Sequence, residues 1–372
     1  MTKSSAPDID VTILGGGIAG LSMADAVLNR GKSTALIDTK PPGSGASGAP
    51  LVLINPATGR RAKLAHNAET CIYWADELLK RTASHSGESF YKKNGVIRPA
   101  LTEGLAKDFK RSPEKYNWPT TDWIHWYDEK EFSAIYPYIG KHYGGLEIPH
   151  AYTVDAATFI KNLISYQQSR GLKTCFSSDY TIQTGTTPFK IDLQSQQSFT
   201  TGIIIFAVGS AVNDSPEWEY LPTSCIKGQL LDLSFKEPLP LSHSISSMGY
   251  FAFNPDNPNR VVAGSTYEHH YDNLETDEKG NLALYKKLER TLPGFKSRDH
   301  AVLMWAGERV SMSDHNPVAG AHPELSGRYI LGGLGSKGMI YGRYLAEQLS
   351  NYIFDEKPID PELSAERFRK HY

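Results

Sequence analysis

The chain opens with an apolar run, a glycine turn, a helical pattern and a second apolar run. The two apolar runs cover residues 10–14 and 33–37, and apolar positions over 21–28 recur with helical periodicity between them. Short apolar runs bounded by turn residues are typical of buried strands, whereas a period of 3.6 residues is typical of a helix. The opening of the chain therefore predicts a βαβ unit with two parallel strands.

Later stretches repeat this pattern far along the sequence. The near-continuous apolar run over 201–208 is typical of the central strand of a parallel sheet. The run 329–331 is followed by small residues and a helical pattern over 339–352, and further helical patterns cover 62–81 and 156–170. We therefore expect the chain to return twice to the opening sheet and to complete one Rossmann-like α/β domain.

The intervening sequence lacks βαβ alternation and predicts a second domain. Its first part is rich in aromatic residues and proline, and its second part has strand patterns over 250–253 and 261–264 and a helical pattern over 282–292. The predicted division gives 1–88, 150–222 and 301–372 to the nucleotide domain and 89–149 and 223–300 to a substrate domain.

The glycine turn after the first apolar run has the G-x-G-x-x-G spacing of a dinucleotide-binding loop. Gly15, Gly17 and Gly20 occupy the glycine positions, and Ile18 and Ala19 lie between the last two. The spacing predicts a tight turn, close approach of the backbone to a diphosphate, and close packing of helix on strand. Asp38, at the end of the next strand, is placed to bind a ribose, and Thr39 follows it. The alternative is a glycine-rich turn that binds nothing.

Three further small-residue turns predict that the ligand is long. One follows Asp38, one follows the 201–208 strand, and one precedes the last helical pattern, where a helix N-terminus can present N–H groups to an electron-rich centre. A flavin needs such a second helix N-terminus, whereas a nicotinamide does not. The candidate cofactor-binding residues in these turns are Gly45, Ala46, Ser47, Gly48, Gly209, Gly333, Leu334, Gly335, Ser336, Lys337, Gly338 and Met339.

Composition and charge limit the partners and the cellular compartment that the sequence predicts. The net charge of −2 over 372 residues gives no electrostatic support for a nucleic-acid partner, although a local basic patch stays open. No stretch approaches the ~18 apolar residues of a membrane span. Three scattered cysteines argue against disulfides and metal sites, so we expect a reduced, cytoplasmic setting and no metal. The sequence carries no signal for oligomeric state.

Several motifs together resemble the D-amino-acid oxidase (DAO) superfamily of FAD-dependent oxidoreductases, which includes glycine oxidase. Within it, the chain is most similar to the FAD-dependent C-terminal domain of the bifunctional tRNA 5-methylaminomethyl-2-thiouridine biosynthesis enzyme. The motifs are the 13–20 glycine turn with Asp38, 45–50, 227–229, 264–267, 307–309 with Asp314 and Pro317, and 332–338. The resemblance implies an α/β (α+β composite) fold of glutathione-reductase type, in which a Rossmann-like FAD-binding domain carries a discontinuous antiparallel-sheet substrate domain.

The same resemblance implies the site residues. Arg309 matches the position that binds a substrate carboxylate, Tyr250 matches a tyrosine that shares it, and Lys337 lies in the turn nearest the flavin. For Arg309 the alternative is a structural salt bridge to Asp314 or Glu308, for Tyr250 a core aromatic, and for Lys337 a solvent-facing lysine. No cysteine falls near the last glycine turn, so we expect non-covalent FAD.

The predicted function is oxidation of the C–N bond of a small amino acid or N-substituted glycine. The resemblance implies hydride transfer to flavin N5, hydrolysis of the imine, and oxygen as the electron acceptor. The first alternative is oxidative removal of the carboxymethyl group from a modified tRNA wobble uridine, which is itself an N-substituted glycine. The second is a non-catalytic flavin- or NAD-binding module. The sequence does not fix the exact amine.

Overall fold

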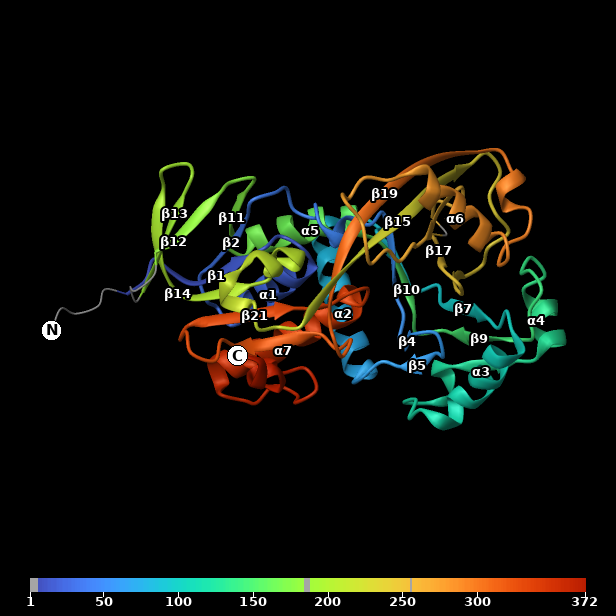
Figure 1. Ribbon diagram of the computed structural model, residues 1–372, viewed down its shortest axis with the longest axis horizontal. Coiled ribbons are helices and arrows are strands. Elements are labelled where there is room, and N and C mark those ends of the chain that lie inside the picture. The colour runs from blue at the N-terminus through green and yellow to red at the C-terminus, as the bar shows by residue number, and fades with distance from the viewer. Residues whose placement is uncertain (1–5, 184–187, 255) are drawn as a thin grey trace.

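The computed structural model describes residues 6–183, 188–254 and 256–372, which form two lobes, each built around a large β-sheet (Figure 1). Residues 1–5, 184–187 and 255, which fall inside predicted segments, lie outside the described residues. The mixed α/β fold confirms the predicted fold class. Among the described residues, no helix is both long enough and apolar enough to cross a bilayer.

The first lobe contains the predicted Rossmann-like sheet. Five of its strands are parallel in the order β11-β2-β1-β14-β21, and antiparallel β12, β13 and β20 extend it. The chain returns to this sheet as predicted, with β14 pairing along β1. The strands are β1 (Ile9–Leu14), β2 (Thr34–Asp38), β11 (Lys173–Phe176), β12 (Tyr180–Gln183), β13 (Phe189–Leu193), β14 (Ser198–Phe206), β20 (Val318–Ala321) and β21 (Arg328–Gly332).

Helices α1 (Ile18–Asn29) and α7 (Gly338–Asp355) contact strands of this sheet, and α2 (Ala68–Ser86) and α5 (Ala156–Ser169) pack on these two helices and on each other. Alternate strand residues such as Val11 and Ile13 are fully buried beneath them. The predicted helix over 62–81 begins six residues later, because Lys63–Leu64 forms the short strand β5, which pairs with β4 (Ala57–Thr58). The side-chain periodicity therefore predicted the helix but not its start.

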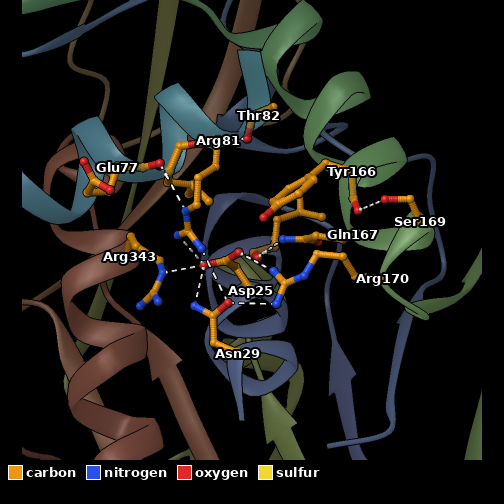
Figure 2. A network of polar contacts seen from close by, with 12 residues as sticks. Asp25, Asn29, Glu77, Arg81, Thr82, Tyr166, Gln167, Ser169, Arg170 and Arg343 are labelled. Carbon is orange, nitrogen blue, oxygen red and sulfur yellow. Dashed lines mark hydrogen bonds and ion pairs between the residues drawn. The ribbon is translucent and has the colours of Figure 1, made fainter. Parts of the chain in front are cut away.

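A buried cluster of charges joins these four helices (Figure 2). Asp25 on α1 is fully buried and lies 2.7 Å from Arg343 Nε on α7, 3.0 Å from Arg81 Nη2 on α2 and 3.1 Å from Arg170 Nη1 at the end of α5. Arg343 also pairs with Glu347 at 2.9 Å. One carboxylate on α1 is thus paired with arginines from α2, from the end of α5 and from α7.

The second lobe contains a mainly antiparallel eight-stranded sheet in the order β19-β15-β18-β17-β16-β7-β9-β8. The long strands β15 and β19 pair over thirteen residues and run from the first lobe along the second (Figure 1). The strands are β7 (Val96–Pro99), β8 (His125–Tyr127), β9 (Gly145–Ile148), β15 (Thr223–Phe235), β16 (Ser244–Ser246), β17 (Tyr250–Phe253), β18 (Arg260–Gly264) and β19 (His300–Met312).

Helices and a small sheet complete this lobe. Alternate residues of β15, β17 and β18 lie on opposite faces of the sheet. On one face, Leu231, Phe251 and Ala263 pack against α6. On the other face, Leu230, Ala252 and Val262 pack against the chain around Leu51. A separate sheet joins β3 (Leu51–Ile54), β10 (Tyr152–Asp155) and β6 (Tyr91–Lys92). The remaining helices are α3 (Glu103–Lys115), α4 (Glu129–Ile135) and α6 (Glu278–Leu288).

Two predicted boundaries differ from the structure. The helix expected over 282–292 is α6, which begins at Glu278 because the Asp277 side chain caps it, accepting from the Gly280 N–H at 2.6 Å. The predicted return to the nucleotide domain at residue 301 does not follow the sheets, because β19 pairs with β15 up to Met312. The division into domains remains a proposal, with this boundary moved to the end of β19.

Candidate active site

The glycine turn lies between β1 and α1, where the backbone makes the sharp turn that its spacing predicts. Gly15 has φ of +110°, a region that L side chains avoid. A β-carbon on Gly20 would lie 1.9 Å from the Gly15 carbonyl oxygen, so a side chain there would separate helix from strand. The turn therefore allows the first turn of α1 to sit directly against the end of β1.

The start of α1 fits an anionic ligand. Its N-cap, Gly17, has no side-chain cap, and no acidic residue occupies the first turn. The Ser47 hydroxyl accepts from the Ile18 N–H at 3.0 Å, which brings the predicted Gly45–Gly48 loop to the same helix start. The first N–H groups of a helix have no partner within the helix, and with the helix dipole they favour a phosphate. These donors fit the diphosphate of FAD.

Asp38 at the end of β2 is tied to the glycine turn. One carboxylate oxygen accepts from the Gly16 N–H at 2.6 Å, and the other accepts from the Lys40 N–H at 2.9 Å. Thr39 follows at an exposed position. A carboxylate oxygen has a second lone pair, so both oxygens retain acceptor capacity. The ribose-binding role of Asp38 therefore remains a proposal that its position allows.

The last glycine turn lies beside the first. The N-cap of α7, Lys337, makes no side-chain cap, and the first turn of α7 is also free of acidic residues. A β-carbon on Gly338 would lie 2.9 Å from Ile18 Cγ2, so the N-termini of α7 and α1 are in contact. Gly209 and Gly333 line a common hollow near the ends of β14 and β21. The fold thus brings the predicted cofactor turns together.

Strand β19 passes two of these turns. The indole Nε1 of Trp305 would lie 3.8 Å from a β-carbon on Gly48, and the Val310 carbonyl accepts from the Gly335 N–H at 2.8 Å. Ser311 Oγ would lie 2.5 Å from a β-carbon on Gly335. Because side chains alternate along a strand, Trp305, Arg309 and Ser311 share one face. Arg309 therefore lies on the strand face that contacts the glycine turns.

The Arg309 guanidinium has neutral partners only. Nη1 donates to Ser265 Oγ at 3.3 Å, Nη2 donates to the Thr266 carbonyl at 3.1 Å, and the group lies 4.5 Å from the Tyr267 ring centroid. The acids that a structural salt bridge would use have other partners. Asp314 pairs with Arg367 at 2.8 Å, and Glu308 accepts from Tyr271. Among the described residues, no carboxylate lies within ion-pair distance of Arg309.

Tyr250 lies close to Arg309 at the start of β17. Burial raises the pKa of the Tyr250 hydroxyl, and the Arg309 charge partly opposes this shift. The hydroxyl donates to the Leu51 carbonyl at 3.3 Å, a long hydrogen bond. Tyr250 therefore has a neutral hydroxyl that lies within reach of the Arg309 charge, and its role in binding a carboxylate remains a proposal.

Lys337 is not part of this pair. Its ammonium donates to the His315 carbonyl at 2.7 Å, and burial lowers its pKa, which Asp314 opposes. No contact in the described part of the chain joins Lys337 to Arg309 or Tyr250. Its place at the N-cap of α7 keeps it beside the last glycine turn, whereas its side chain turns toward the segment after β19.

Sequence reasoning missed several residues around Arg309. The segment Ser265–Tyr267 supplies both hydrogen-bond acceptors and the ring, and Lys287 approaches the same segment from α6. The 264–267 motif contributed to the resemblance, and it was the available signal for Tyr267. Lys287 looks in the sequence like a lysine on the solvated face of a helix, and no local pattern marks it.

Comparisons with known proteins agree with this geometry. The family model described as FAD dependent oxidoreductase (DAO) matches residues 10–352. The bifunctional tRNA 5-methylaminomethyl-2-thiouridine biosynthesis protein MnmC of Thiobacillus denitrificans is 24% identical over 96% of this chain, which spans 59% of that relative. Two solved structures share its fold. Glycine oxidase from Geobacillus kaustophilus has a TM-score of 0.84 and 20% identity, and the match covers 95% of this chain and 96% of that one. Iminodiacetate oxidase from Chelativorans sp. has a TM-score of 0.80 and 19% identity, and the match covers 94% of this chain and 97% of that one.

Proposed function

Because the chain belongs to the DAO family of FAD-dependent oxidoreductases, we propose that it oxidises the C–N bond of a small amino acid or an N-substituted glycine. The observation that carries this proposal is Arg309, a guanidinium on the face of β19 that contacts two glycine turns and that has no carboxylate partner in the described part of the chain. Arginine presents five donors in a rigid fork that matches a carboxylate. The proposed ligand of Arg309 is the carboxylate of the substrate.

The glycine turns are proposed to hold non-covalent FAD along the carboxyl ends of the first sheet. Gly15–Gly20 and the start of α1 would bind the diphosphate, Asp38 the ribose, and Gly45–Gly48 with Gly333–Met339 the region of the flavin ring. The chemistry that FAD supplies when bound is acceptance of a hydride from the carbon next to the amine, after which the imine hydrolyses. The protein contributes orientation and a fixed electrostatic environment.

Two side chains orient the substrate in this proposal. Arg309 fixes the carboxylate, and the carbon that bears the amine is thereby held at a set position relative to the glycine turns, which lowers the entropic part of the barrier. Tyr250 donates its hydroxyl to the same carboxylate in place of the long hydrogen bond to Leu51. A tyrosine hydroxyl is protonated at neutral pH, and burial raises the pKa of Tyr250 further above its ordinary value.

An anaerobic reduction screen tests the proposal. Purified protein loaded with FAD is mixed without oxygen with glycine, sarcosine, and D- and L-amino acids, and the flavin absorbance is recorded. Bleaching by at least one small amine that carries a carboxylate, followed by recovery of colour on admitting oxygen, is the expected result. Protein that stays colourless with added FAD, or yellow protein that neither free amines nor modified tRNA bleaches, would support the non-catalytic alternative instead.

The second candidate function is removal of the carboxymethyl group from a modified tRNA wobble uridine. The observation that favours it is the similarity to MnmC over 96% of this chain. The substrate group is an N-substituted glycine, so the same Arg309 contact applies. Modified tRNA is therefore added to the screen, at low and at raised salt, because a contact with phosphates weakens as salt rises. Bleaching by tRNA but not by free amines would favour this second function.

A cytoplasmic setting is proposed as well. All three cysteines are free, and Cys71 is buried on α2. Disulfides are rare in reducing compartments, so this state of the cysteines supports the setting that the composition suggested.

A further inference from the structure

Lys287 approaches Arg309 from the end of α6. Its ammonium donates to the Ser265 carbonyl at 3.1 Å and lies 5.8 Å from the Tyr267 ring centroid. Arg309 donates to the Ser265 hydroxyl and lies 4.5 Å from the same ring centroid. One segment after β18, Ser265–Tyr267, therefore carries both cations.

The charges of Lys287 and Arg309 are not balanced by a nearby acid in residues 6–183, 188–254 and 256–372. Among the described residues, neither Lys287 nor Arg309 has a carboxylate within ion-pair distance. Glu268 is the acid next along the segment; it accepts from Gln229 Nε2 and from the Thr266 hydroxyl and lies 3.8 Å from Lys227 Nζ. Burial lowers the pKa of Lys287, and the Arg309 charge lowers it further. Two like charges on one half-buried segment repel each other, and a bound anion would offset that repulsion.

A substrate with a single carboxylate, bound by Arg309, leaves the Lys287 ammonium without an anionic partner. A single carboxylate that binds both arms of the Arg309 fork uses one lone pair of each oxygen for that contact, and in the proposed complex the Tyr250 hydroxyl donates to it as well. Lys287 is a compact point charge that orients three donors freely, and it suits an anionic group at a different distance. The two side chains also come from different elements, β19 and α6, so they reach the Ser265–Tyr267 segment by separate routes.

We propose that Lys287 binds a second anionic group of the substrate, so that the preferred substrates are amines with two carboxylates. This inference rests on the proposed function, because it extends the site built around Arg309. It assigns Lys287 the role of a specificity residue: Arg309 binds the carboxylate common to all substrates, and Lys287 selects those with a second one.

The test compares two secondary amines on the FAD-loaded enzyme. Iminodiacetate has two carboxylates and sarcosine has one, and both present the same N–CH₂–COO⁻ group. For Lys287→Gln we expect the ratio of the KM for iminodiacetate to that for sarcosine to rise roughly tenfold or more, the range of a hydrogen bond to a charged group. Lys286→Gln, which removes the adjacent exposed lysine, should leave the ratio unchanged. Lys287→Arg should retain most of the preference for two carboxylates.

A binding measurement separates this inference from the proposed function. Glutarate has two carboxylates and no amine, so it binds without oxidation, and its Kd is measured by calorimetry against that of acetate for wild type and Lys287→Gln. A selective loss of glutarate binding in the variant supports the inference even if no amine bleaches the flavin. An equal effect on glutarate and acetate, or a loss of tRNA binding with glutarate unaffected, would overturn it. Equal melting temperatures of wild type and Lys287→Gln exclude a folding defect.

Discussion

The side chain of Arg309 crosses the backbone of Gly228. A β-carbon on Gly228 would lie 2.5 Å from Arg309 Nη2 and 3.0 Å from Cζ. Gly228 is on β15, between β19, which carries Arg309, and the Ser265–Thr266 segment, which accepts its hydrogen bonds. The missing side chain therefore opens the path by which the guanidinium reaches its position.

Gly228→Ala should displace Arg309 without removing it. The methyl group would occupy space that the guanidinium now fills, so the fork would lose its alignment with a substrate carboxylate. We expect a rise in KM for carboxylated amines of roughly tenfold or more, with FAD still bound. Steady-state kinetics and the flavin absorbance measure the two effects. Arg309→Ala is the comparator, and a Gly228→Ala enzyme with the kinetics of wild type would contradict the proposed path.

Gly17→Val should prevent FAD retention. A β-carbon at this position would lie 3.1 Å from Ser47 Oγ, which accepts the hydrogen bond from the Ile18 N–H. A valine side chain would therefore displace this hydroxyl and block the approach of a diphosphate to the turn. The absorbance at flavin wavelengths after gel filtration measures retention. Gly104→Ala in α3 is the matched control, because the nearest atom to its added β-carbon is 4.0 Å away. A Gly17→Val protein that elutes yellow would count against the diphosphate site.

Asp25→Asn should destabilise the first lobe. The substitution removes the buried charge that pairs with Arg343, Arg81 and Arg170, and Arg343 is itself only 1% exposed. Loss of one partner from a buried ion pair typically costs about 3–5 kcal/mol of unfolding free energy. Urea unfolding at neutral pH measures the change. Asp355→Asn, which breaks the surface pair with Arg30, is the control and should shift the midpoint far less.

Binding of a second carboxylate should depend on pH through Lys287. The pKa of Lys287 lies below the usual value of 10.5, chiefly because of burial and then because of Arg309. The groups that face its ammonium are Arg309 on β19 and Tyr267 after β18. Only the protonated ammonium attracts a carboxylate, so glutarate affinity is present below this pKa and is lost as pH rises through it.

Calorimetric titration of glutarate over a pH series measures this loss. In Lys287→Arg the affinity should stay level across the same range, because arginine keeps its charge. Acetate is the control ligand in both proteins. A decline in glutarate affinity that the arginine variant shares would assign the titration to another group.

Local patterns in the sequence were sufficient to predict several elements of the first lobe. The 10–14 run became β1, the 156–170 pattern became α5 to within one residue, and the glycine spacing predicted the turn at Gly15. These features depend on neighbouring residues: side-chain period, an apolar run, and backbone freedom at one position. The 250–253 strand in the second lobe was predicted with its exact bounds for the same reason.

Features that depend on distant residues were not predictable. No helix was expected within 89–149, yet α3 and α4 lie there. In α3 only Phe109 and Ser112 are buried, with Leu105 and Ala106 packed nearby, and Pro113 lies inside the helix, so its apolar stripe is short and ends in a residue typical of turns. Strands β15 and β19 are longer than their apolar runs because each is the other's partner over thirteen residues. The position of Lys287 beside Arg309 depends on how α6 and β19 meet the 265–267 segment, which no short window of sequence contains.

The pairing of β15 with β19 fixes the direction in which the substrate-binding side chain points. Side chains along a strand alternate between its two faces, so one inserted residue between Trp305 and Arg309 would move the guanidinium from the face toward the glycine turns to the face that packs against α6. The same insertion in the 268–276 loop would leave it in place. Binding of a substrate carboxylate thus depends on an even spacing between Trp305 and Arg309 along β19, because an odd spacing would place the two side chains on opposite faces.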